Sequence, residues 1–387
     1  MNNRNLSGRK YFTLSDLQRL NWLRLIRSQN VGPATFRDLI SHYGTAEQAL
    51  EAIPELAKRG GAAARIEICS RDTAEYELMQ AERCGARFIG IGEPDYPAIL
   101  RNTDGSPPIL CVRGKISTFS EKSLAIVGSR NASIAGLKIT ERLSRQMGGN
   151  SYVIISGLAR GIDTAAHKAA IETGTIAVFA GGVDHVFPEE NSNLAEAIHD
   201  AGGALVSEMP MGWQPRAKDF PRRNRIITGL SRAVLVVEAA RKSGSLITAR
   251  LANEMGRSIL AIPGSPLDPR SEGTNNLIRE GATLVANVED IMEALLPLDR
   301  DMTAAEDDIW EDELELFEYP QINAENLNDS AREKVIAALG PSPVLIDDIL
   351  QFTDASPGEV QLTLLELSLA GKLEHHPGGL VSLVDLK

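Results

Sequence analysis

Short apolar runs alternate with amphipathic segments along residues 123–296. Continuous Val, Ile, Leu and Ala runs are typical of strands buried on both faces, and an amphipathic segment between two such runs is typical of a crossover helix. The alternation predicts a mainly parallel, doubly wound α/β sheet of the Rossmann-like type. The expected strands are residues 124–127, 152–155, 175–180, 204–206, 233–237, 258–262 and 283–285.

Helical periodicity replaces this pattern in residues 1–84, which we expect to form a separate N-terminal domain. An amphipathic stretch at 14–28 is interrupted at 30–35, where Gly32 and Pro33 occur, and a second amphipathic stretch follows. This order resembles the helix-hairpin-helix, or SAM-like, module, in which backbone amides of the hairpin meet a DNA phosphate. A helical bundle without a ligand fits the same pattern, because one such hairpin is a weak motif.

Residues 85–120 contain many turn-forming residues and two short apolar pieces, at 88–91 and 109–112. We interpret this stretch as a connector whose strands extend the sheet, so that the Rossmann-like domain spans residues 85–298. The acidic residues 299–330 break the strand and helix pattern and are expected to form a linker.

Residues 331–387 show three helical segments followed by a hairpin pattern, which predicts a winged-helix domain. The domain has four basic and eight acidic residues. Its third helix carries Glu359 and Glu366, whereas a helix that reads the major groove needs Arg or Lys. The charges therefore favour a protein-contact or regulatory role over duplex recognition.

Charge is distributed unevenly in this 387-residue chain, whose net charge is -12. Residues 299–330 hold twelve acidic residues and one basic residue, whereas residues 213–250 hold nine basic and two acidic residues. The central stretch is thus suited to a polyanion although the whole chain is acidic. No apolar run is long enough for a membrane span and no secretory signal is visible, so we expect a cytoplasmic protein without membrane contact.

Glycine, serine and arginine recur where the strands of this sheet are expected to end. In an open α/β sheet, ligands bind beyond the carboxyl ends of the strands, near helix N-termini whose free amides attract anions. Residues 218–225, Lys-Asp-Phe-Pro-Arg-Arg-Asn-Arg, add four cations and an aromatic ring, a composition suited to clamping phosphates and stacking a base. The candidate DNA-binding residues are Gly128, Ser129, Arg130, Gly157, Arg160, Lys218, Phe220, Arg222, Arg223, Asn224, Arg225, Ser243, Gly244 and Ser245.

Structural roles compete with binding roles at several of these positions. Asn224 and Arg225 can instead satisfy loop carbonyls, and Arg250 can serve as an internal ion-pair partner. Asp163 and His167 lie four residues apart on an expected helix and can pair without catalysing a reaction. No phosphate loop, metalloprotease motif or nucleophile elbow occurs, and the three cysteines lack metal-ligand spacing, so we expect no catalytic residues, metal or cofactor.

The motifs together resemble the DNA-processing protein A (DprA/Smf) family. Six segments occur in the family's order, at residues 125–130, 156–163, 220–227, 243–250, 263–265 and 273–278. The N-terminal helical domain and the winged helix are also similar to those of longer family members. The resemblance implies a non-enzymatic protein that binds and protects single-stranded DNA and loads the RecA recombinase during natural transformation.

The same resemblance implies a homodimer formed through the Rossmann-like domain. By motif position, Arg130 and Lys218 would contact phosphates and Phe220 would stack on or wedge a base. The three neighbouring arginines, at 222, 223 and 225, would complete a basic pocket, and the resemblance leaves open which of them points outward.

Two other classes of function remain alternatives. The fold is similar to that of the cytokinin-activating phosphoribohydrolases, which hydrolyse nucleotides with a Pro-Gly-Gly-x-Gly-Thr-x-x-Glu loop, but this chain has no complete loop of that kind. A partner-binding scaffold would suit the acidic winged helix and linker. Because a strongly acidic block and a basic block share one chain, we also consider that residues 299–330 shield the basic pocket.

Overall fold

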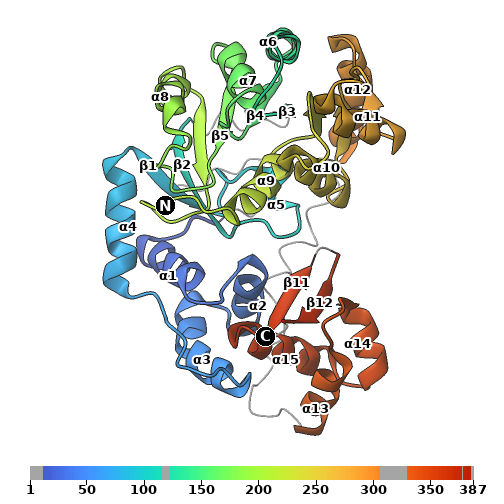
Figure 1. Ribbon diagram of the computed structural model, residues 1–387. Coiled ribbons are helices and arrows are strands. Elements are labelled where there is room, and N and C mark those ends of the chain that lie inside the picture. The colour runs from blue at the N-terminus through green and yellow to red at the C-terminus, as the bar shows by residue number, and fades with distance from the viewer. Residues whose placement is uncertain (1–11, 116–121, 306–328, 377, 385–387) are drawn as a thin grey trace. The chain divides into compact units, whose positions relative to one another are not determined.

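The computed structural model describes residues 12–115, 122–305, 329–376 and 378–384 (Figure 1). The chain divides into two compact units, here called the helical unit (Met1–Tyr76 with Asp308–Lys387) and the sheet unit (Glu77–Asp307). Helix α4 (Arg71–Arg83) contains the division and contributes to both. Within the described ranges, no helix is long and apolar enough to cross a membrane.

The sheet unit is built on a nine-stranded sheet in the order β1-β2-β6-β5-β4-β3-β7-β8-β9. Strands β1 and β2 join antiparallel at one edge, and the pairs from β6 through to β9 are parallel, which confirms the predicted mainly parallel sheet. The strands are β1 (Ala86–Gly90), β2 (Ile109–Gly114), β3 (Ser123–Val127), β4 (Val153–Ser156), β5 (Thr175–Val178), β6 (Ala204–Ser207), β7 (Ala233–Val236), β8 (Ser258–Ala261) and β9 (Thr283–Leu284).

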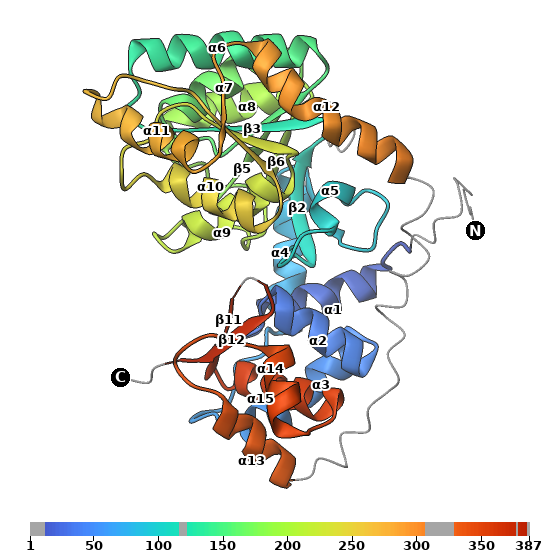
Figure 2. The ribbon, with the colours of Figure 1, turned by 90° about the vertical axis from the view of Figure 1, so that its right-hand side faces the viewer.

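Alternate residues of each central strand enter two different cores, because side chains of a strand point to opposite faces. In β3, Ala125 and Val127 join the apolar cluster that includes α9 and α10, whereas Leu124 and Ile126 join the cluster that includes α6, α7 and α12. Figures 1 and 2 show helices on both sides of the sheet. The helices are α5 (Ala98–Arg101), α6 (Ile134–Gly149), α7 (Ile162–Ala170), α8 (Ser192–Asp200), α9 (Asp219–Gly229), α10 (Gly244–Glu254), α11 (Glu272–Arg279) and α12 (Val288–Ala305).

Strand order reverses between β3 and β7. The chain runs from β3 through β4 and β5 to β6 in one direction, and from β7 through β8 to β9 in the other. The loops that follow β3 and β7 therefore diverge from one point of the carboxyl edge, which is where doubly wound sheets generally bind their ligands. The sequence motifs lie in the loops of this edge and at the start of α9 and α10.

The N-terminal part of the helical unit contains α1 (Asp16–Arg27), α2 (Pro33–Tyr43) and α3 (Ala46–Arg59), as expected from the periodicity. Ser15 and Gln18 form a capping box that fixes the start of α1. Between α1 and α2 the chain turns through Asn30, which adopts a positive φ of 59°. The rings of Trp22 and Phe36 pack edge to face at 5.1 Å and hold the two helices together.

The C-terminal part of the same unit has the predicted winged-helix elements. A small sheet in the order β10-β12-β11 packs with three helices around an apolar core that includes Val335, Ile349, Val360 and Val381. The elements are α13 (Asp329–Ala338), β10 (Val344–Leu345), α14 (Ile346–Thr353), α15 (Pro357–Leu369), β11 (Leu373–His376) and β12 (Leu380–Leu383).

Helix α15, the third helix of the winged helix, also packs against α2 and α3. The Asn30 side chain donates to the carbonyl of Leu369 at 2.9 Å, so the α1–α2 hairpin is tied to the end of α15. A side chain at Gly60 would place its Cβ 2.0 Å from the carbonyl oxygen of Glu366, so the close approach requires glycine. The interior position of α15 agrees with the expectation, based on its charges, that it does not read a duplex.

The predicted acidic linker is described only at its ends. Helix α12 continues to Ala305, and α13 begins at Asp329, so both reach into the stretch 299–330. Residues 306–328, which carry most of its charge, lie outside the described residues.

Candidate nucleic-acid interface

Two of the sequence motifs meet at the carboxyl edge of the sheet. Arg130, in the loop after β3, is exposed, and its guanidinium carbon lies 5.1 Å from the centre of the Phe220 ring in the first turn of α9. A guanidinium at this distance over an aromatic face gains cation–π stabilisation. Residues 90 positions apart in the sequence thereby form one basic and aromatic spot.

The helical rotation of α9 separates the arginines that sequence analysis grouped together. Lys218 is the N-cap residue and is exposed, as is Arg222 one turn later. Arg223 is only 6 % exposed, and the Arg225 side chain is 17 % exposed. Of the three arginines, Arg222 is therefore the one that points outward.

Arg223 lies in the interior, so the expectation that it contributes a phosphate contact does not fit this geometry. Its guanidinium donates to the carbonyls of Gly157 and Val178, and Nε donates to Asn224 Oδ1 at 3.0 Å. Burial lowers the pKa of Arg223 to about 10, against the opposing charge of Asp163. A Cβ at Gly157 would lie 1.9 Å from Arg223 Nη1, so Gly157 makes room for this side chain rather than for a phosphate.

Arg225 and Asn224 have the structural roles that were considered as alternatives. Arg225 forms an ion pair with Glu208 and donates to the carbonyl of Gly105. The side-chain amide of Asn224 donates to the carbonyl of Gly244 at 3.4 Å, which links α9 to the start of α10. Both side chains connect separate segments of the chain, which is a structural role.

The remaining candidate residues lie in the loops at the carboxyl edge of the sheet. Several of them contact neighbouring residues. Arg160, after β4, is exposed and pairs with Glu190 at 2.7 Å. The Ser129 hydroxyl accepts from the amide of Asn131, and Ser243 caps α10 by accepting from the amide of Ser245. Gly128 and Gly244 complete the set at the ends of these loops, where Gly244 is exposed and Gly128 is half-buried against Ile162.

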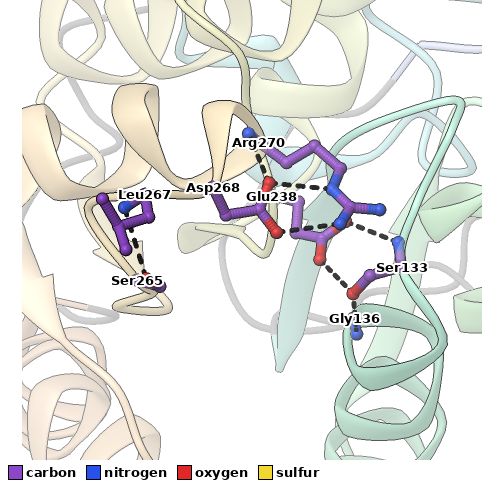
Figure 3. A network of polar contacts seen from close by, with 7 residues as sticks. All are labelled: Ser133, Gly136, Glu238, Ser265, Leu267, Asp268 and Arg270. Atoms are coloured by element: carbon purple, nitrogen blue, oxygen red, sulfur yellow. Dashed lines mark hydrogen bonds and ion pairs between the residues drawn. The ribbon is translucent and has the colours of Figure 1, made fainter.

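The N-terminus of α6 is already occupied by a carboxylate of the chain itself (Figure 3). Glu238, which follows β7, accepts from the Ser133 amide at 2.9 Å and from the Ser133 hydroxyl, while that hydroxyl caps α6 by accepting from Gly136. A Cβ at Gly136 would lie 2.6 Å from the carboxyl carbon of Glu238, so glycine is needed here. Glu238 therefore occupies the N-terminus of α6, where free amides would otherwise attract an anion.

Arg270 and Asp268 lie on the neighbouring loop in the same view. Asp268 caps the short helix after it and holds Arg270 through a two-pronged ion pair of 3.0 and 2.8 Å. This pairing lowers the pKa of Asp268 and raises that of Arg270. Asp268 and Arg270 thus compensate each other's charge within this loop.

Asp163 and His167 do not bond to each other. Asp163 accepts from the amides of Gly157 and Ala159, at 3.1 and 3.3 Å, and fixes the loop after β4. His167 Nδ1 lies 2.7 Å from the hydroxyl of Thr175. Burial raises the pKa of Asp163, and burial with the charge of Arg223 lowers the pKa of His167 to about 3. Both residues therefore have structural surroundings, as sequence analysis favoured.

Three side chains around the start of α9 were not among the predicted site residues. Phe187, in the loop after β5, is 50 % exposed and meets the Phe220 ring edge to face at 5.8 Å. Trp213 donates from Nε1 to Asp219, and Arg216 lies over its ring at 4.5 Å. An aromatic residue in a loop at the carboxyl edge was the available signal, whereas the predicted site rested on glycine, serine and arginine.

The fold and this edge define a class: a doubly wound α/β protein with a basic and aromatic carboxyl edge, joined to hairpin helices and a winged helix. The chain belongs to the DNA recombination-mediator protein A family, whose family model matches residues 87–296. Residues 16–80 match the DprA-like N-terminal HHH domain and residues 320–379 match the DprA winged helix domain, which confirms the resemblance found in the motifs.

Relatives are similar over most of the chain. Protein Smf of Synechocystis sp. is 31% identical over 393 residues, covering 94% of this chain and 98% of the relative. Protein Smf of Escherichia coli is 37% identical over 321 residues, covering 81% and 82%. The structure of DNA processing protein A from Streptococcus pneumoniae matches with a TM-score of 0.58 and 33% identity, covering 72% of this chain and 96% of that one.

Proposed function

We propose that the chain is a single-stranded DNA-binding recombination mediator that protects incoming strands and loads the RecA recombinase during natural transformation. The observation that carries the proposal is the contact between exposed Arg130 and the Phe220 ring, with Lys218 and Arg222 exposed on the first turn of α9. Cations there can hold the phosphates while an aromatic ring contacts the base, and membership of a recombination-mediator family supports this use.

Single strands suit this interface better than duplex DNA. A base exposes its π face only when it is not stacked within a duplex, and stacking on an aromatic ring tolerates any base. Phosphate contacts carry no sequence information and weaken with salt. Binding is therefore expected to be independent of sequence, sensitive to salt and selective for single strands.

The protein acts in this proposal as a binding protein in the cytoplasm, not as an enzyme. Asp163 and His167, the nearest approach to an acid–base pair in the sequence, are bonded to structural partners. A homodimer formed through the sheet unit, and contact with RecA, complete the proposed assembly. Light scattering tests the dimer, and recombinase filament formation on strands coated with single-strand-binding protein tests the loading.

The deciding experiment is a salt titration of binding to fluorescent oligo-dT beside its duplex counterpart. Arg130→Ala and Arg222→Ala should each weaken binding, and each lost phosphate contact should reduce the salt slope by about 0.7. Arg145→Ala is a matched control, because Arg145 is an exposed arginine three turns along α6.

Equal affinity for both strands, or no effect of either substitution, would refute the proposed interface. The hydrolase alternative would then be tested by the release of free base from nucleoside monophosphates.

A further inference from the structure

We propose that Phe187 provides a base-stacking face of the interface and that the Phe220 ring holds the Phe187 ring in place through an edge-to-face contact. This inference rests on the proposed single-strand function and assigns a residue that the motif resemblance leaves out. Within the described part of the sheet unit, Phe187 is the one strongly exposed aromatic residue, at 50 %. Its ligand is the π face of an unpaired base.

The Phe220 ring is less available than its position in the motif suggests. It is half-buried, and two guanidinium groups lie against it: exposed Arg130 at 5.1 Å and buried Arg223 at 5.9 Å from the ring centre. A base that stacked on Phe220 would compete with Arg130 for the ring. Phe187 meets Phe220 edge to face, with an interplanar angle of 61°. An edge-to-face contact leaves ring surface on Phe187 open to a further partner.

The loop that carries Phe187 is anchored on its C-terminal side. Asn191, four residues on, is buried and donates to the carbonyl of Leu158 at 2.8 Å. Glu190 pairs with Arg160 at 2.7 Å, so the loop after β5 is tied to the loop after β4. An aromatic ring displayed on a fixed loop loses little conformational freedom on binding, which favours stacking.

Arg130 lies beside the ring pair and gives the site a phosphate contact next to the base contact. One nucleotide can therefore place its base on Phe187 and a flanking phosphate near Arg130, without displacing the guanidinium from Phe220. The arrangement separates the two contributions: Phe187 supplies stacking, which is indifferent to salt, and Arg130 supplies the ionic term.

The test compares Phe187→Ala with wild type on oligo-dT and on an abasic strand of the same length. The variant should bind oligo-dT roughly tenfold more weakly with an unchanged salt slope, and should bind the abasic strand as wild type does. Phe187→Tyr, which keeps a π face, should restore affinity. Phe352→Ala is the matched control, because Phe352 is an exposed phenylalanine at 80 % in the acidic surroundings of α14.

A direct readout comes from Phe187→Trp, whose added fluorescence should be quenched by oligo-dT and not by the abasic strand. If wild type binds oligo-dT and Phe187→Ala binds both strands as tightly, the stacking role is wrong while the proposed function stands. If wild type itself does not bind oligo-dT, the proposed function fails first. An equal loss on both strands would make Phe187 a structural support and would also overturn the inference.

Discussion

At the scale of single residues, Arg222 and Arg223 are neighbours in sequence with opposite surroundings. Arg222 faces solvent, whereas Arg223 is buried and bonded to two strand-end carbonyls. Removing Arg223 would leave those carbonyls and the Asp163 carboxylate without their buried cation. Arg223→Ala is expected to destabilise the fold by about 3 kcal/mol, which lowers the melting temperature of a domain of this size by roughly 6 to 12 °C.

Arg222→Ala should leave the melting temperature unchanged and weaken only DNA binding. Thermal unfolding and a salt titration on the same preparations separate the two effects. Gly157→Ala provides an independent check, since its Cβ would collide with Arg223 and should reproduce the loss of stability. An Arg223→Ala protein that melts like wild type would contradict the interior role.

His167 gives the fold a specific sensitivity to acid. Burial lowers its pKa to about 3 in the folded protein, whereas the unfolded chain takes up a proton near pH 6.5. The unfolded state therefore binds more protons as pH falls below 6.5, and stability declines by at most about 1.4 kcal/mol per pH unit. The raised pKa of Asp163 acts in the opposite direction, because the folded state then takes up a proton more readily than the unfolded chain does.

The expected result is a steeper loss of stability in wild type than in His167→Asn between pH 6.5 and 5. Asparagine keeps a polar partner for Thr175 and cannot be protonated in this range. Chemical denaturation at each pH measures the difference. Parallel curves for the two proteins would show that His167 is protonated in the folded state or reached by solvent.

At the scale of secondary-structure elements, sequence patterns predicted the strands well. They did not predict which residues of α9 are buried and which are exposed. Strands such as β3 and β7 are continuous apolar runs that only a doubly covered sheet can bury. In α9 the buried stripe includes Arg223, Ile226 and Ile227, and the two isoleucines follow Arg223 by three and four residues. A cation in that stripe was the signal for an interior arginine, but composition alone suggested three equivalent cations.

The carboxylate at the α6 N-terminus was beyond sequence analysis for a different reason. Glu238 lies 105 residues after Ser133, and only the β3–β7 pairing brings them together. No local pattern marks a long-range contact of this kind. The motif at the strand end could be predicted from the sequence. That the Glu238 carboxylate occupies the start of α6 could not be.

Helix α15 is enclosed on nearly all sides. Its residues from Leu362 to Leu369 are all buried, so the helix has apolar neighbours all round, as a fully enclosed helix does. The carboxylate of Glu366 is stabilised in this buried position because Arg332 forms an ion pair with it at 3.0 Å. Burial raises the pKa of Glu366, and Arg332 opposes that shift.

Arg332→Ala is therefore expected to destabilise the helical unit by about 3 kcal/mol, because it leaves a buried carboxylate unpaired. Hydrogen exchange of the α15 amides should accelerate more than that of the sheet unit. Adding Glu366→Gln should recover part of the loss, since the uncompensated charge is removed. Lys334→Ala is the control, because Lys334 is an exposed cation on α13, the helix that also carries Arg332. An equal effect of both substitutions would argue against the ion pair.

At the scale of the whole molecule, the positive charge that reaches solvent is smaller than the sequence suggested. Of the nine cations in residues 213–250, Arg223 and Arg232 are buried, and Arg225, Arg241 and Arg250 have acidic partners. The proposed interface is therefore a small group of residues, Arg130, Lys218, Phe220 and Arg222, rather than a broad basic face. A small number of phosphate contacts makes binding more susceptible to any competing acidic segment.

The acidic residues 306–328 are the natural candidate for such competition, since they carry nine acidic residues and no basic one. Replacing them with a Gly/Ser linker of equal length should raise affinity for oligo-dT several-fold at low salt. The gain should disappear near 0.5 M salt, because the range of electrostatic interactions falls to about 4 Å there. Changing the nine acids to Asn and Gln should give the same result, which separates charge from chain length. Equal affinity of all three proteins at low salt would mean that the segment does not shield the interface.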